Sequence, residues 1–302
     1  MALGSSGLLR DYMPELDYLF LFMPIVFKQN PTDTPVTATN SQFAHYFSGL
    51  FEGDGTIVVP KRERSDKGRL YYPSLELCFS AHDFPLAMLV QQVLGCGSLS
   101  KIYGKNAYNL AIKDRAGVLL VFSLLNGKLR TAPKVRKLAQ LADWLNVRDA
   151  ELGLVSLPAS DLLLSETAWF SGFADADGHF SANVTAKTSD RHQRVRCAFE
   201  LVQSSGGEDT ATTLQDIADF LGVSLCTTGR EQYRIRTSSV QQNKKLEQYF
   251  STFPLFSAKR LDYQDWLLVV AIFENKTHNT PGGVQKIKEV IQRMNSRRTD
   301  FV

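Results

Sequence analysis

Several features that would place a protein in a class at once are missing from this chain of 302 residues. Its four cysteines, Cys78, Cys96, Cys197 and Cys226, form no Cys-x-x-Cys pair. This scatter argues against a zinc site and against a framework of disulfides. We therefore expect a protein of a reducing compartment whose fold depends on its core.

No segment looks built for a membrane or for secretion. The apolar stretch 18–27 is interrupted by Pro24 and is shorter than the ~20 residues that cross a bilayer. Asp11, Glu15 and Asp17 precede this stretch, whereas a signal peptide begins with basic residues. No membrane partner is expected.

A strong excess of charge of one sign is also missing, because the formal net charge is only +3. Lysine and arginine nevertheless concentrate in segments typical of strands, while many acids lie in segments typical of helices. This arrangement indicates a basic sheet surface that can meet a polyanion, although an ordinary solvated face explains it equally well. The hydrophobic content of 44% is enough for real cores, in one large domain or two of ordinary size.

What the chain does have is a short stretch that occurs twice. Residues 47–55 read Phe-Ser-Gly-Leu-Phe-Glu-Gly-Asp-Gly, and residues 170–178 read Phe-Ser-Gly-Phe-Ala-Asp-Ala-Asp-Gly. Each copy ends in two acids and a glycine, and a strand-like segment follows it. The surrounding elements repeat in the same order, which indicates an internal duplication.

The expected elements define an α/β (α+β) fold of two similar halves. For the first half we predict a helix from 42 into the first motif, strands 56–62 and 69–80, helix 84–94, strands 98–103 and 107–113, and helices 116–125 and 134–145. For the second half we predict helix 166–177, strands 179–188 and 194–204, helix 209–221, strands 224–228 and 232–237, and helices 240–250, 259–275 and 284–295. The corresponding divisions are an extension 1–40, a first half 41–147, a linker 148–164 and a second half 165–302.

Small residues recur four apart in each motif, Gly49 with Gly53 and Gly172 with Ala176. On a helix this spacing makes a stripe against which another backbone can pack closely. A glycine inside a helix costs ~1 kcal/mol relative to alanine, so close packing explains Gly49 and Gly172 better than helix termination does. We expect the two motif helices to lie side by side about a pseudo-two-fold axis.

Such packing brings together Asp54 and Asp177, the last acid of each motif. Two carboxylates at the negative ends of helix dipoles do not both stay ionised unless a cation lies between them. Carboxylate and carbonyl oxygens suit Mg²⁺, which can promote hydrolysis of a phosphodiester. The alternative is that both acids are solvated helix ends. A calcium loop beginning at Asp175 is not favoured, because Gly178 comes two positions early and the distal Glu is missing.

The predicted strands alternate apolar and polar residues, and the polar faces carry many cations in both halves. Two-stranded ribbons fit the major groove of DNA, where such side chains contact bases and phosphates. The candidates for contact with double-stranded DNA are Arg62, Arg64, Lys67, Arg69, Lys101, Lys105, Lys113, Asn183, Lys187, Arg194, Arg196, Arg230, Arg234 and Arg236. Ordinary sheet-surface charge accounts as well for any single member, but less well for the whole set.

The two motifs resemble the signature of the LAGLIDADG homing endonucleases, in the single-chain form that carries two copies. The shared positions are the third, Gly49 and Gly172, the eighth, Asp54 and Asp177, and the closing glycines Gly55 and Gly178. The resemblance covers residues 41–295. Glu52 departs from the aspartate usual at the sixth position, which the second copy keeps as Asp175, and both are expected to be structural.

The resemblance implies two αββαββα halves, packed through the motif helices, whose sheets form a saddle over a long DNA site. It implies that Asp54 and Asp177 are catalytic, bind Mg²⁺ (or Mn²⁺ or Ca²⁺ in its place) and cleave one strand each. The other positions expected to contribute are the carbonyls of Gly53 and Ala176 at the metal, Glu76 and Glu200 near the metal-bound water, and Lys259 with either Lys128 or Lys134 at the scissile phosphate.

Three functions agree with these residues. The first is a monomeric, site-specific DNA endonuclease that needs a divalent metal. The second is an intron maturase that binds RNA, and the third is a DNA-binding protein that has lost cleavage. The presence of both eighth-position acids favours the first. Relatives are often encoded in organellar introns as extensions of an upstream exon, and stretch 18–27 suits such a remnant, which points to mitochondria.

Overall fold

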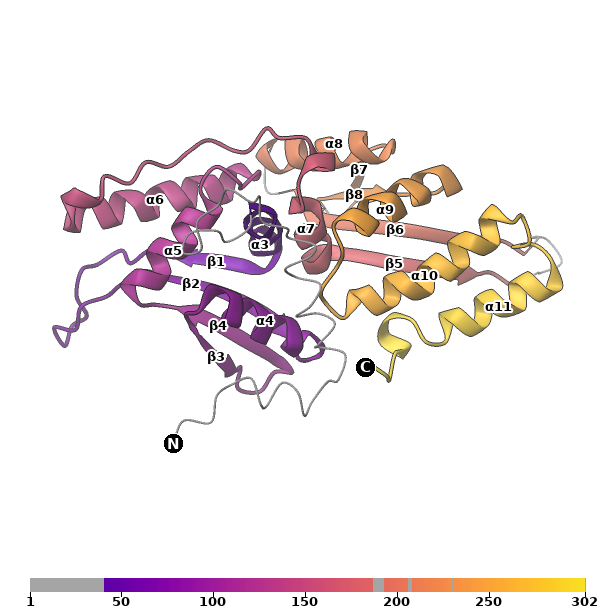
Figure 1. Cartoon of the computed structure of the whole chain (residues 1–302), viewed down its shortest axis with the longest axis horizontal. Coiled ribbons are helices and arrows are strands. Elements are labelled where there is room, and N and C mark those ends of the chain that lie inside the picture. Colours follow the sequence, from indigo (N-terminus) through magenta and orange to yellow (C-terminus); the bar gives the residue numbers. More distant parts are fainter. Residues whose placement is uncertain (1–40, 187–192, 206–207, 230, 302) are drawn as a thin grey trace, which may run out of the picture.

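The structure is a computed structural model, and it describes residues 41–186, 193–205, 208–229 and 231–301. The expected extension 1–40 lies outside the described residues. Two halves lie side by side, each built on one antiparallel sheet, and the motif helices meet between them (Figure 1). No helix in the described ranges is long and apolar enough to cross a membrane.

The first half places its motif helix directly before the first strand of its sheet. In chain order its elements are α3 (Ser41–Asp54), β1 (Gly55–Val58), β2 (Ser74–Ser80), the 3₁₀ turn η1 (Ala81–Asp83), α4 (Phe84–Leu94), β3 (Ser98–Lys101), β4 (Ala107–Ile112), α5 (Arg115–Leu125) and α6 (Ala132–Arg148). The strands lie in the order β1-β2-β4-β3. The strand that follows the motif is therefore an edge strand of its sheet.

The second half repeats this order and adds a helix. Its elements are α7 (Trp169–Asp177), β5 (Gly178–Val184), β6 (Val195–Ser204), α8 (Glu208–Leu221), β7 (Cys226–Thr228), β8 (Gln232–Arg236), α9 (Val240–Thr252), α10 (Lys259–Glu274), α11 (Pro281–Ile291) and the 3₁₀ turn η4 (Asn295–Arg297). The strand order is β5-β6-β8-β7. The expected αββαββα pattern is thus confirmed in both halves; one more helix follows it in each (α6 and α10), and α11 with η4 extends the second.

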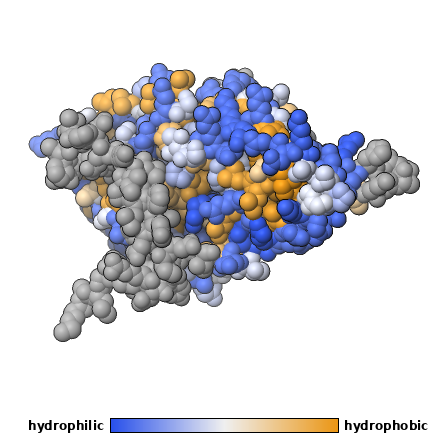
Figure 2. All heavy atoms as spheres, turned by 45° about the vertical axis from the view of Figure 1, so that its right-hand side comes forward, coloured by the Kyte–Doolittle hydropathy of each residue, from blue (hydrophilic) through white to orange (hydrophobic). Residues whose placement is uncertain are grey.

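One face of each sheet lies against the core. Phe180, Phe199 and Leu201 are buried, whereas His179 and Val202, which point to the opposite face, are exposed. The buried apolar side chains of both halves form one continuous cluster. In the view of Figure 2, hydrophilic side chains surround an apolar area on an otherwise mostly hydrophilic surface.

Several strands are shorter than predicted. The predicted strands 56–62 and 69–80 are reduced to β1 and β2, and residues 59–73 form a long connection closed by one bridge between Arg64 and Leu70. Pro60 has no backbone N–H to donate to a ladder, and charged residues follow it, so pairing ends at Val58. The predicted strand 179–188 likewise ends at Val184.

The last predicted helix is wrong at both ends. It was expected at 284–295, but α11 runs from Pro281 to Ile291. Proline is tolerated in the first turn of a helix, where its missing N–H has no partner in any case. Thr280 caps the helix by accepting from the N–H of Gly283 at 3.1 Å.

The two motif helices, α3 and α7, pack with their backbones in contact. A Cβ atom on Gly49 would lie 1.9 Å from the carbonyl oxygen of Trp169, and one on Gly172 would lie 1.9 Å from that of Tyr46. The contacts are reciprocal, because each motif glycine meets the backbone of the other helix. The expected packing through the motif helices about a pseudo-two-fold axis is confirmed.

The segment between the halves is held against the first half. It passes over α6 in Figure 1 before it reaches α7. Asn126 donates to the carbonyl of Val155 at 2.9 Å and accepts from the N–H of Leu157 at 2.8 Å. The N–H of Ser160 donates to the carbonyl of Leu129 at 2.7 Å. These bonds fix the path of the connection.

Candidate active site between the motif helices

The last acids of the two motifs end the two central helices. Asp54 is the final residue of α3 and Asp177 is the final residue of α7. A Cβ atom on Gly53 would lie 2.2 Å from Ala176 Cβ and 2.9 Å from Asp177 Oδ2. The missing side chain at position 53 therefore leaves room for the Asp177 carboxylate beside the end of α3.

Both carboxyl groups hold their protons more tightly than usual. The pKa of Asp54 is raised to about 6, first because protein atoms displace water and second because the charge of Asp177 is near. Burial also raises the pKa of Asp177, against the lowering effect of Lys259 and of a hydrogen bond from Gln203. Part of Asp54 remains exposed to solvent, so a dissolved cation can reach the pair. A bound cation would remove the repulsion between the two carboxylates.

Two lysines, one from each half, flank the acids. Lys134 of α6 donates to the carbonyl of Gly55. Lys259, the first residue of α10, donates to the carbonyl of Asp175 at 2.8 Å and to that of Ala176. Burial lowers the pKa of both ammonium groups, and the two eighth-position acids oppose that shift. The site thus combines two carboxylates and two anchored cations.

The sixth-position acid of the first motif, Glu52, is buried and fully engaged. Its carboxylate accepts from the backbone N–H of Arg130 at 3.0 Å, and from both the N–H and the hydroxyl of Thr131 at 2.6 Å. It also accepts from the indole N–H of Trp169, which belongs to the other motif helix. Glu52 therefore ties its own half to its neighbour.

Asp175 makes the mirrored set of contacts. It accepts from the hydroxyl of Tyr46 at 2.7 Å, from the N–H of Phe256 at 2.7 Å, and from the N–H and hydroxyl of Ser257 at 3.2 and 2.5 Å. Tyr46 of α3 thus plays the part that Trp169 of α7 plays for Glu52. These contacts give both sixth-position acids a structural role.

One polar contact to the acids was not foreseen from the sequence. The Gln203 amide, on β6, donates to Asp177 Oδ2 at 2.6 Å. The strand pairings identify the equivalent residue in the first half. Gly178 pairs with Leu201 in the second sheet, and Gly55 pairs with Leu77 in the first. Two residues further along each strand, Phe79 therefore occupies the position of Gln203. The signal in the sequence was a polar residue at an inward position, after Phe199 and Leu201.

The donor set fits a magnesium ion. Mg²⁺ keeps several waters and is commonly bound through one or two carboxylates. Asp54 and Asp177 offer such a pair, and the charge of Asp177 adds to the effect of burial in raising the pKa of Asp54. Across the described ranges, no group of three or more His, Cys, Asp or Glu side chains is placed to hold a metal. The site does not match a zinc centre.

A sequence model of the LAGLIDADG endonuclease family matches this chain twice, at residues 47–146 and 170–270. The two matches together span well over half of the chain, and each begins at one of the motifs. The chain belongs to the LAGLIDADG endonuclease family. Each match contains one motif helix with its small residues and its terminal acid.

Relatives and solved structures of this LAGLIDADG protein agree with that assignment. The intron-encoded DNA endonuclease aI3 of Saccharomyces cerevisiae is 26% identical, over 85% of this chain and 70% of its own length. The intron-encoded RNA maturase bI4 of the same yeast is 25% identical over 51% of this chain and 22% of its own length. The DNA-bound LAGLIDADG meganuclease I-AabMI superposes with a TM-score of 0.68 at 20% identity, over 83% of this chain and 99% of that chain. The fold is the same.

Two predicted site residues of the LAGLIDADG protein, Glu76 and Glu200, lie on the polar faces of the sheets. Glu76 accepts from the hydroxyl of Ser74 at 3.0 Å and from the amide of Asn109 at 3.2 Å. Glu200 lies 3.6 Å from the guanidinium of Arg236. Both carboxylates thus face neighbours on their own sheets, and Gln203 rather than Glu200 contacts Asp177.

The two lysine candidates of the first half are separated by the fold. Lys134 is close enough to both eighth-position acids for their charges to raise its pKa. Lys128 instead lies beside His45, where its charge contributes to lowering the pKa of that histidine to about 4, after burial as the main cause. Of these two lysines, the structure brings Lys134 to the acids.

The candidate DNA-binding residues are spread over the outer faces and connections of both sheets. The exposed members of the set are Arg62, Arg64, Lys67, Arg69, Lys101, Lys105, Lys113, Asn183, Arg194 and Arg196, while Arg234 and Arg236 are half-buried. Asn183 of β5 pairs with Arg196 of β6. Lys187 and Arg230 lie outside the described residues.

Proposed function

We propose that this protein is a homing endonuclease that hydrolyses both strands of a long, nearly asymmetric DNA target as a monomer. The observation that carries the proposal is the pairing of Asp54 with Asp177 at the crossing of the motif helices, with one anchored lysine from each half. A binding protein without chemistry would have no use for two like charges placed side by side at a helix crossing, which the fold must hold together at a cost.

The metal that we propose is Mg²⁺, held by Asp54 and Asp177 with help from the carbonyl of Gly53. A divalent ion between two such acids supplies an activated water and stabilises the leaving oxygen of a phosphodiester. Lys259 already bonds the carbonyl of Ala176, so this oxygen is less available than the carbonyl of Gly53. The two carboxylates therefore hold the ion in place, and the carbonyl of Gly53 is the backbone oxygen that adds to its binding.

The lysines have a separate task. The ammonium groups of Lys134 and Lys259 are anchored by backbone carbonyls at the ends of the two motifs, close to the two carboxylates. A phosphate group placed against the acids would therefore meet two fixed positive charges. Preorganised cations of this kind stabilise the negative charge that builds up on the phosphoryl oxygens as water attacks. The outer faces of the two sheets, rich in lysine and arginine, position the duplex for this step.

Single asparagine substitutions test the assignment. Asp54→Asn and Asp177→Asn keep the shape of each side chain but remove one negative charge from the metal site. With a target recovered by cleavage selection from a random DNA library, we expect each variant to lose double-strand cleavage in Mg²⁺ and to keep its affinity for the duplex. Glu151→Gln serves as the control, because it removes one negative charge from an exposed side chain in the segment between the two halves. Normal cutting of both strands by either asparagine variant would disprove the assigned site.

A second function has one specific observation in its favour. The maturase bI4 is similar to half of this chain. Binding of this protein to its own intron RNA, at an affinity that Asp54→Asn does not change, would support a maturase role beside the nuclease. If selection finds no cleaved DNA while that RNA is bound tightly, RNA binding is the main function.

The relatives also bear on where the gene lies. Both yeast relatives are intron-encoded by name. Together with the apolar stretch 18–27, which suits a translated exon remnant, this supports an origin in a mitochondrial intron. Sequencing the DNA that flanks the reading frame tests it, because exon sequence should join the frame without a stop codon.

A further inference from the structure

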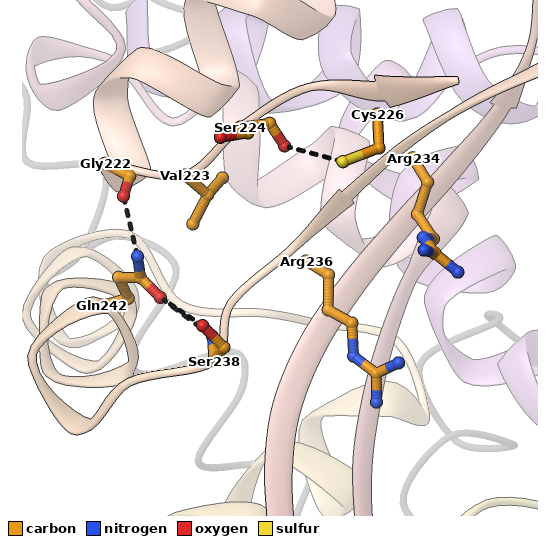
Figure 3. A pocket seen from close by; sticks show the side chains of 8 residues that line it. All are labelled: Gly222, Val223, Ser224, Cys226, Arg234, Arg236, Ser238 and Gln242. Atoms are coloured by element: carbon orange, nitrogen blue, oxygen red, sulfur yellow. Dashed lines mark hydrogen bonds between the residues drawn. The ribbon is translucent and has the colours of Figure 1, made fainter. Parts of the chain in front are cut away.

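A pocket of about 460 Å³ opens at the outer edge of the second sheet (Figure 3). Its lining residues are Gly222, Val223, Ser224, Cys226, Arg234, Arg236, Ser238 and Gln242. They come from the end of α8, the edge strand β7, strand β8 and the start of α9. Because the strand order is β5-β6-β8-β7, this edge is the one farthest from the motif strand β5 and from the acids.

Two guanidinium groups give the pocket its charge. Arg234 and Arg236 alternate with the buried Ile235, so both stand on the outer face of β8, and Figure 3 shows their side chains extending in the same direction. Arg236 lies 3.6 Å from the carboxylate of Glu200. The backbone of Arg234 pairs with Val202 and Cys226 in the sheet, but within the described residues its guanidinium group makes no hydrogen bond or ion pair. The half-buried guanidinium of Arg234 is therefore available to bind an anion in the pocket.

Hydrogen bonds hold the wall opposite the arginines in place before any ligand binds. The amide of Gln242 donates to the carbonyl of Gly222 at 2.7 Å and accepts from the N–H of Ser238 at 2.8 Å. The hydroxyl of Ser238 contacts the same amide oxygen at 3.5 Å. These bonds tie the end of α8 to the start of α9, so the pocket does not have to form when a ligand arrives. Because fewer side chains have to become ordered when a ligand binds, each contact contributes more to the affinity.

The first half has no equivalent of this charge. Glu200 is opposite Arg236 in the second sheet, whereas the corresponding Glu76 is opposite Ala111 in the first. By the same register, Asn109 stands where the second half has Arg234, and its amide is taken up by Glu76. The duplicated halves therefore differ here in charge.

We infer that this pocket binds a phosphate of the DNA backbone and anchors one end of the target without reading its bases. The inference rests on the proposed function, because it requires a bound duplex on this sheet. Guanidinium groups bind phosphate oxygens strongly, and nearby hydroxyl groups add donors for the same oxygens. A half-buried guanidinium in a concavity suits a tetrahedral phosphate, whereas base reading in a groove suits exposed side chains such as Asn183 and Arg196.

The test measures how the affinity for DNA depends on salt concentration, in the cleavage-inert Asp54→Asn background. Neutralising one phosphate contributes about −0.9 to the slope of log K against log salt. Arg234→Gln is therefore expected to make the slope shallower by about 0.9 and to weaken binding about tenfold, equally for the target and an unrelated duplex. Arg234→Lys should keep the slope. Lys286→Gln, the same charge change on α11, is the control and should leave it unchanged.

A second measurement locates the phosphate. Methylphosphonate linkages, which are uncharged, are placed singly along the target. One linkage near one end should weaken binding of the Arg234 protein about tenfold and leave the Arg234→Gln protein unaffected. The base pair beside that linkage should tolerate substitution.

Two results would overturn the inference. If Arg234→Gln relaxes the preference for one base pair and leaves the salt slope intact, Arg234 reads a base. If no linkage affects the two proteins differently, the pocket does not touch DNA. If the protein with Asp54 intact cleaves its target in either case, the proposed function stands, whereas a protein that binds no duplex at all contradicts both the inference and the proposed function.

Discussion

Replacing Glu52 by glutamine tests whether the sixth-position acid holds the two halves together. The carboxylate oxygens accept from the N–H of Arg130, from the N–H and hydroxyl of Thr131, and from the indole of Trp169. Glutamine turns one of these oxygens into an NH₂ donor. In the less damaging orientation the new donor replaces Oε2 and faces the indole N–H of Trp169, which then has no acceptor.

The magnitude follows from these contacts. A buried donor left without a partner costs ~1–3 kcal/mol, and a hydrogen bond loses ~0.5–1 kcal/mol when its acceptor is no longer charged. The bonds from Arg130 and Thr131 each weaken in this way. Burial of the Glu52 carboxylate raises its pKa, which means that the buried charge is unfavourable. Glutamine removes this charge, and that gain offsets part of the lost stability. We expect the free energy of unfolding to fall by about 3 kcal/mol.

Urea unfolding of the metal-free protein measures this loss. Glu151→Gln is the control and should change the unfolding free energy by less than ~0.5 kcal/mol, as exposed substitutions usually do. Trp169→Phe removes the donor that glutamine leaves unpaired, so the double variant should lose less than the two single losses added together. A Glu52→Gln protein as stable as the wild type, or a double variant with additive losses, would refute the network as described.

Three further predictions concern the centre of the molecule. Gly172→Ala is expected to lower the unfolding free energy in urea by about 3 kcal/mol, because its Cβ would meet the backbone of α3, whereas Gly282→Ala, with open space around it, should be neutral. Gln203→Met should slow cutting of one strand by about 10 to 100-fold in single-turnover assays, and Phe79→Leu should leave the ratio of the two strand rates unchanged. In the metal-free protein, the raised pKa of Asp54 stabilises the fold below pH 3.8, the ordinary pKa of an aspartate, and this stabilisation is lost as the pH rises through about 6. The free energy of unfolding should therefore fall between these two pH values, and it should fall less in Asp54→Asn.

The repeated motif was enough to predict much of the fold. Glycines at a helical spacing imply close helix packing, and two copies imply a pseudo-two-fold axis, which α3 and α7 realise. Helix bounds followed where local signals were strong, as at α4, which ends at Gly95 in the left-handed conformation. Strand ends failed where Pro60 stops pairing, because periodicity alone does not show how far a partner strand extends.

The contacts around the acids were harder to predict, because they join residues far apart in the sequence. The bond from Trp169 to Glu52 spans 117 positions, and that from Gln203 to Asp177 depends on the register of β5 with β6. Lys134 and Lys128 are equally plausible in the sequence, and only the start of α6 decides which one faces the site. Local patterns indicate which residue types are available, while tertiary packing selects among them.

The docked connection between α6 and α7 affects how the protein assembles. An interface with two-fold character can also form between separate molecules, and its strength would then vary with protein concentration. Because one chain carries both halves, their association is unimolecular, and a connection already bonded along the first half presents the second at a high effective concentration. A complete interface then forms even when a cell holds only a few molecules of the protein. The two halves can also differ in sequence, as they do at the equivalent positions Gln203 and Phe79.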